Sequence, residues 1–69
     1  MAVSYEQARR FYAVIRAERL DIGDAARRSG LKFADATEIW AKGVAAGRLK
    51  IADDFPGFRY IQEIREDGS

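Results

Sequence analysis

The segment from Asp21 to Leu49 places two short helical patterns on either side of a single glycine. The first pattern covers residues 24–29, the second covers residues 33–46, and Gly30 lies between them. Glycine most readily adopts the positive φ that is needed where a helix ends and the chain turns sharply. The pattern therefore predicts two helices joined by a tight turn, and the rest of the chain is expected to be organised around this pair.

A third helix is predicted ahead of the pair, over residues 4–19. Ser4 and Gln7 have the spacing of a capping box, in which each side chain bonds the backbone of the other. Apolar residues then recur at helical spacing, in Tyr5, Ala8, Phe11, Tyr12 and Ile15. The three arginines of this segment, Arg9, Arg10 and Arg16, lie away from this apolar stripe. They form either a solvated face or a surface that contacts phosphate.

The short segment Leu20-Asp21-Ile22 is expected to be extended, as a single bridge of strand, before Asp21 or Gly23 caps the next helix. A helical wheel of residues 33–46 predicts one core-facing side, bordered by Thr37 and Ile39. That side comprises Phe33, Ala36, Trp40, Gly43 and Val44. Gly47 is expected to end this helix.

From Arg48 onward the apolar period changes to that of strands, at residues 49–53 and 58–63. The two strands are connected by Asp54-Phe55-Pro56-Gly57. Pro56-Gly57 favours a type II turn in which Pro56 is the second residue and Gly57 the third. Residues 65–69 are polar and expected to fray. The sequence thus predicts one mainly α-helical domain over residues 1–69, with a helix-turn-helix core of three helices followed by a β-hairpin, or wing.

Composition excludes several classes of function. The 69 residues include no cysteine and no histidine, so disulfide bonds and the usual zinc sites are excluded. Neither a catalytic constellation nor a glycine-rich phosphate loop is present, and we expect no enzyme activity, no catalytic residues, no metal, no cofactor and no small-molecule substrate. With no long apolar run and no signal-peptide pattern, a cytoplasmic protein without membrane contact is expected.

Three helices followed by a hairpin resemble the winged-helix superfamily, and most of all the gamma domain of FtsK-type DNA translocases. The matching residues, spread over residues 5–62, are Tyr5, Ala8, Ile22, Arg27-Arg28, Leu31-Lys32-Phe33, Ala36, Ala45-Ala46-Gly47 and Gly57-Phe58-Arg59. The resemblance implies sequence-specific binding of duplex DNA by the third helix and the wing. It also implies a regulator of transcription or of a mobile element, because the motor of a translocase is missing from so short a chain.

The expected DNA-binding residues come from the second helix, the third helix and the wing. They are Arg27, Arg28, Lys32, Thr37, Glu38, Lys42, Arg48, Lys50 and Arg59. The chain departs from the family at the start of the third helix, where Ala34-Asp35 replaces basic and amide side chains. The outward face of that helix is expected to hold Ala34, Asp35, Glu38, Lys42 and Ala45, with a net charge of about −1.

Two interpretations therefore stay open. The chain binds double-stranded DNA, as a homodimer because one small module buries little surface. Alternatively, it binds a protein partner through the acidic face of the third helix and Phe55 at the wing tip. The net charge of +1 does not decide between them, because a basic body and an acidic tail leave room for a local positive face. Arg27 and Arg28 also have a local role at a helix end, and Glu38 and Lys42 have the spacing of an ion pair.

Overall fold

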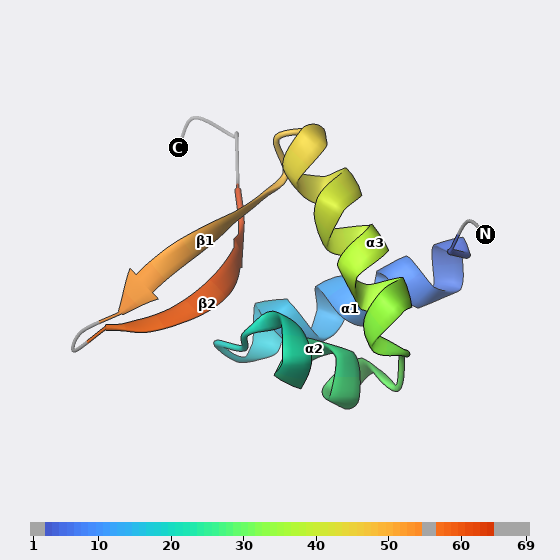
Figure 1. Cartoon of the computed structure of the whole chain (residues 1–69), viewed down its shortest axis with the longest axis horizontal. Coiled ribbons are helices and arrows are strands. Elements are labelled where there is room, and N and C mark those ends of the chain that lie inside the picture. Colours follow the sequence, from blue (N-terminus) through green and yellow to red (C-terminus); the bar gives the residue numbers. More distant parts are fainter. Residues whose placement is uncertain (1–2, 55–56, 65–69) are drawn as a thin grey trace.

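The structure, a computed structural model, describes residues 3–54 and 57–64. Three helices come first: α1 spans Tyr5–Ala17, α2 spans Ile22–Ser29 and α3 spans Phe33–Ala45. An antiparallel hairpin follows, with β1 at Leu49–Asp54 and β2 at Phe58–Glu63. Figure 1 shows the helices gathered into one body, with the hairpin extending away from the end of α3. This arrangement confirms the predicted helix-turn-helix core followed by a wing.

The first helix begins as predicted and ends earlier. Ser4 forms a full capping box, because its hydroxyl accepts from the Gln7 N–H at 3.1 Å and its own N–H donates to Gln7 Oε1 at 2.9 Å. The helix ends at Ala17, since Glu18 has an extended backbone with φ −142° and ψ 158°. This change of direction brings Leu20 into the core.

The second helix begins two residues earlier than predicted, at Ile22. Asp21 caps it, since Asp21 Oδ1 accepts from the Asp24 N–H at 2.8 Å, and Ile22 is therefore helical and not extended. The expected bridge of strand is reduced to one hydrogen bond, in which the Ile61 N–H donates to the Leu20 carbonyl at 2.9 Å. That bond attaches β2 to the α1–α2 linker.

Two glycines end helices in the way the sequence predicts. Gly30 has φ 74° after α2, and Gly47 has φ 75° after α3. Both lie in the left-handed region, which a residue with a Cβ enters only with strain. Gly30 therefore sets the sharp turn that leads from α2 into α3.

The side of α3 that faces the core matches the predicted one at Ala36, Trp40 and Gly43, but it is rotated toward Ile39. Ile39, expected at the border, is only 3% exposed, whereas Phe33 and Val44, expected in the core, are 58% and 45% exposed. The small residues Ala36 and Gly43 lie on the buried side of α3. Their size lets α3 approach its neighbours closely, and this contact turns the larger Phe33 and Val44 outward.

The core lies between the three helices and the base of the hairpin. Its buried members are Phe11, Ile15, Leu20, Ala25, Ala26, Ala36, Ile39, Leu49 and Ile61. Trp40 is half-buried and packs against this cluster, as expected of a core residue near an edge. Tyr5, also predicted on the apolar stripe of α1, is 80% exposed, although Val3 and Ala8 on either side of it in the chain pack against the core.

The hairpin pairs in a single register, with Leu49 opposite Glu63 and Asp54 opposite Phe58. The Gly57 N–H donates to the Asp54 carbonyl, which places Gly57 at the fourth position of the turn and not at the predicted third. Phe55 and Pro56, which complete the predicted turn, lie outside the described residues, as does the predicted frayed segment 65–69.

Candidate functional site

Short side chains dominate the outer surface of α3. Ala34, Ala41 and Ala45 are exposed along it. The Thr37 hydroxyl lies 3.0 Å from the Phe33 carbonyl and 2.8 Å from the Ala34 carbonyl, so it donates to its own helix. The strip of α3 that holds these residues is therefore free of long side chains.

The two acidic residues of α3 are not both on its outer surface. Asp35 is half-buried on the side toward α1, where its Oδ2 accepts from Gln7 Nε2 at 3.5 Å. Glu38 pairs with Lys42 at 3.3 Å between Oε2 and Nζ, which confirms the predicted ion pair. Asp35 therefore lies at the α1 edge of the predicted outward face, and the charges of Glu38 and Lys42 balance each other in their ion pair.

Three of the predicted DNA-binding arginines are held in exposed ion pairs. Arg27 pairs with Asp24. Arg28 pairs with Glu18 at 2.6 Å, and Arg59 pairs with Asp53 at 3.6 Å. Exposed pairs of this kind contribute only about 0–1 kcal/mol, so another anion can exchange with the carboxylate at little cost.

The remaining predicted cations have no ion pair within residues 3–54 and 57–64: Lys32, Arg48 and Lys50. Lys32 is the N-cap residue of α3, and Lys50 is exposed on β1, the strand that follows α3. One lysine therefore precedes α3 in the chain and the other follows it. Arg48 instead lines a groove beside α1. The predicted site residues are therefore divided between two surfaces.

The position of the wing depends on two arginines that the sequence did not single out for this role. Arg19 pairs with Asp54 of β1, and its guanidinium carbon lies 5.3 Å from the centre of the Tyr60 ring on β2. Arg16 forms a two-pronged bond with Glu63, from Nε at 2.6 Å and from Nη2 at 2.9 Å. Opposite charges on the first helix and the hairpin were the available signal, but only the fold shows which of them meet.

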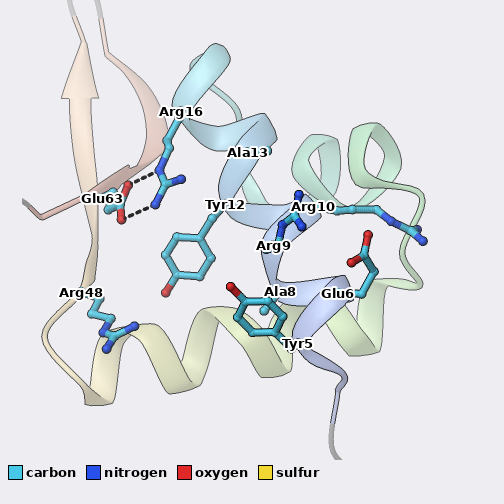
Figure 2. Close-up of a pocket in the computed structure, with 10 residues that line it drawn as sticks. All are labelled: Tyr5, Glu6, Ala8, Arg9, Arg10, Tyr12, Ala13, Arg16, Arg48 and Glu63. Atoms are coloured by element: carbon cyan, nitrogen blue, oxygen red, sulfur yellow. Dashed lines mark hydrogen bonds and ion pairs between the residues drawn. The ribbon is translucent and has the colours of Figure 1, made fainter.

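The groove beside α1 has a volume of about 550 Å³ and is lined by arginine and tyrosine side chains. Its principal members are Tyr5, Arg9, Tyr12, Arg16, Arg48 and Glu63. Figure 2 shows the Tyr12 ring between Arg48 and Arg9, with the Tyr5 ring below Arg9. Because α1 and the base of the hairpin supply its walls together, no single stretch of sequence predicted it.

The surroundings of the groove shift the pKa of two of its residues, Tyr12 and Arg16. Burial raises the pKa of Tyr12 above its ordinary value; Arg48 opposes this shift and Glu63 adds to it. The hydrogen bonds that Arg16 donates to Glu63 raise the pKa of the Arg16 guanidinium. Tyr12 therefore stays a neutral hydroxyl, able both to donate and to accept a hydrogen bond.

Within the described ranges, no cluster of three or more acidic, histidine or cysteine side chains could hold a metal ion. Nor does any helix described there have the length and apolar character needed to cross a membrane. In comparisons with known proteins, no family model, no curated protein and no solved structure matches the chain.

Proposed function

We propose that this chain is a winged-helix regulator that binds duplex DNA through α3 and the wing. The resemblance to the gamma domain of FtsK-type translocases supports this proposal, and so does the layout of two helices around Gly30 followed by a hairpin. Regulation of transcription or of a mobile element is the role we infer for such DNA binding.

One observation carries the proposal: the outer surface of α3 is neutral and lies between unpaired cations. Ala34, Ala41 and Ala45 have short side chains, so the helix can approach the floor of a major groove. Lys32 precedes α3 and Lys50 follows it on β1, and neither has a carboxylate partner among the described residues. These two lysines are suited to contact phosphates on either side of the groove.

The paired cations add to this surface on binding. Arg59 on the wing and Lys42 on α3 hold carboxylates at 3.6 and 3.3 Å, with their side chains largely exposed. Exposed ion pairs are weak, whereas neutralising a phosphate releases condensed counterions from the DNA. The free energy of that release favours exchanging the carboxylate for the phosphate at low salt.

The test is a titration of the chain against a fluorescent duplex of random sequence at several salt concentrations. The affinity is expected to fall as salt rises, with a log–log slope of roughly 0.9 for each phosphate contacted. Lys32→Gln and Lys50→Gln are each expected to weaken binding and to reduce the slope by about 1.

Arg9→Gln is the matched control, because it removes the same charge from the groove beside α1. Its affinity for the duplex is expected to change much less. Absence of binding at low salt, or an equal loss in the Arg9 variant, would overturn the proposal.

A second candidate function is contact with a protein, including a second copy of the chain, and one observation favours it. Phe33 and Val44 lie exposed on α3, and two exposed apolar side chains on one helix suit a protein interface. This hypothesis now depends on these two residues, since Phe55 lies outside the described residues and Asp35 is turned toward α1. Sedimentation of the chain and of the Phe33→Ser variant over a range of concentrations tests self-association.

A further inference from the structure

The groove beside α1 lies on a different surface from the one proposed to bind DNA. Helix α1 packs against the buried side of α3, the side that holds Ile39 and Gly43. Tyr5, Arg9 and Arg16 therefore lie on the α1 side of the molecule. Lys42 of α3 borders this side, where it lines a small pocket with Tyr12 and Arg48. A duplex seated on α3 and the wing would leave this groove open to another partner.

Two arginines beside the tyrosine rings, Arg9 and Arg48, have no ion pair among residues 3–54 and 57–64. Arg10 also lines the groove and has none there, but it points away from the rings (Figure 2). Arg9 lies on α1 and Arg48 follows α3, and both side chains are exposed. Figure 2 shows Arg9 and Arg48 on either side of the Tyr12 ring. The groove thus presents two separate guanidinium groups, each able to bind a carboxylate in two-pronged geometry.

A third arginine shows what ligand this surface accepts. Arg16 already holds the Glu63 carboxylate, at 2.6 and 2.9 Å from its two nitrogens. The same guanidinium lies 5.7 Å from the centre of the Tyr12 ring. The groove therefore already contains one bound carboxylate next to a tyrosine ring, that of Glu63 near Tyr12.

Between the arginines the groove is apolar and aromatic. The Tyr5 ring is 80% exposed, Tyr12 is half-buried, and Ala8 and Ala13 also line the groove. An aromatic or aliphatic side chain can pack against these rings while neighbouring carboxylates reach the arginines. The groove therefore fits a segment with both kinds of side chain.

The charge of the groove distinguishes a polypeptide from a nucleic acid. Its lining includes Glu6 and Glu63 beside four arginines. A phosphodiester strand carries a charge at every nucleotide and would have to pass these carboxylates, whereas the acidic residues of a polypeptide can be spaced to avoid them.

From this geometry we infer that the groove beside α1 is a docking site for an acidic segment of a partner protein. Carboxylates of the segment bind Arg9 and Arg48, and an apolar side chain between them packs on Tyr5 and Tyr12. The site is independent of the proposed DNA contact. It lets the protein hold a partner while α3 faces DNA.

The test measures fluorescence anisotropy of the full chain with a short labelled peptide in which pairs of Glu are separated by single Phe residues. A peptide with Gln in place of every Glu is the control ligand and is expected to bind far more weakly. Arg9→Gln and Arg48→Gln are each expected to weaken binding about threefold, and the double variant about tenfold. Tyr5→Ala is expected to weaken it further, through loss of the ring contact.

Arg27→Gln is the matched control variant, because it removes the same charge from the exposed surface of α2. An equal loss in this variant, or equal binding of the Glu and Gln peptides, would overturn the inference. Tighter binding of a labelled single-stranded oligonucleotide that depends on Arg9 and Arg48 would assign the groove to nucleic acid instead. Duplex titrations of the Arg9→Gln and Arg48→Gln variants separate the two proposals, since duplex binding is expected to persist in both.

Discussion

Gly43 of α3 lies directly against Leu49 of β1. A Cβ at position 43 would be 2.3 Å from Leu49 Cδ1, 2.6 Å from Leu49 Cγ and 3.0 Å from the Tyr12 hydroxyl. Leu49 is only 2% exposed, so its side chain has no free space into which to move. This contact fixes how closely α3 approaches the base of the wing.

We therefore expect Gly43→Ala to destabilise the protein. Alanine is favoured over glycine inside a helix by about 1 kcal/mol, but overpacking a buried site costs about 1–3 kcal/mol. The clash at 2.3 Å places this site toward the upper part of that range, and a net loss results. Thermal unfolding followed by circular dichroism measures it.

Gly23→Ala is the control for this prediction, because it makes the same change in α2. A Cβ there would meet only Asp21 Oδ1, at an ordinary 3.7 Å. We expect this variant to keep or raise the unfolding temperature. If Gly43→Ala behaved in the same way, the close approach of α3 to Leu49 would be contradicted.

A second prediction concerns the attachment of the wing. Arg19 contacts both strands, through its ion pair with Asp54 and its position over the Tyr60 ring. Arg19→Ala is expected to cost about 1 kcal/mol or less, because both contacts are partly exposed. Backbone amides of β1 and β2 should exchange hydrogen faster, while those of α3 should be unchanged.

The control is Arg59→Ala, since its pair with Asp53 is long, highly exposed and confined to the hairpin. Hydrogen exchange in the wing should stay near the rate of the unmodified protein. Equal acceleration in both variants would mean that Arg19 does not anchor the wing to the α1–α2 linker.

The sequence predicted the elements of this fold well because their signals are local. Ser4 and Asp21 cap helices, and Gly30 and Gly47 end them, each through contacts within a few residues. Strand β2 has the predicted bounds, and the other elements differ from their predicted bounds by two residues or fewer at each end.

The sequence predicted the buried side of α3 only in part. The wheel placed Ala36, Trp40 and Gly43 correctly, but it also placed Phe33 and Val44 in the core, where the buried residue is Ile39. The close contact at Gly43 links α3 to a distant residue, Leu49. Similarly, the groove depends on Arg48 and Glu63 meeting α1 across the fold. Contacts between distant segments carry no local pattern, so neither feature could be read from spacing.

A third prediction is a loss of stability at alkaline pH that depends on Tyr12. Burial raises the pKa of Tyr12 above its ordinary value of 10.0, so the folded protein keeps a proton that the unfolded chain loses. The stability that Tyr12 provides is fully present below pH 10 and is lost as pH rises toward the folded pKa. Tyrosinate absorbance and urea unfolding across this range measure both effects.

Tyr12→Phe is expected to remove this part of the pH dependence, because phenylalanine does not titrate. Tyr5→Phe, at the highly exposed first position of α1, is the control and should leave the dependence intact. The same alkaline loss in the Tyr12 variant would show that another group is responsible.

A fourth prediction tests whether the carboxylate on the outer surface of α3 opposes DNA binding. Glu38→Gln removes a negative charge and releases Lys42 from its 3.3 Å ion pair. If α3 enters the major groove, the variant should bind a random duplex several-fold more tightly at low salt, since repulsion from phosphates falls and one more cation can contact them. Glu6→Gln makes the same change of charge on α1, in the groove that the DNA is not expected to reach. An equal gain in the Glu6 variant would trace the effect to total charge, and a gain confined to Glu38 would locate the duplex on α3.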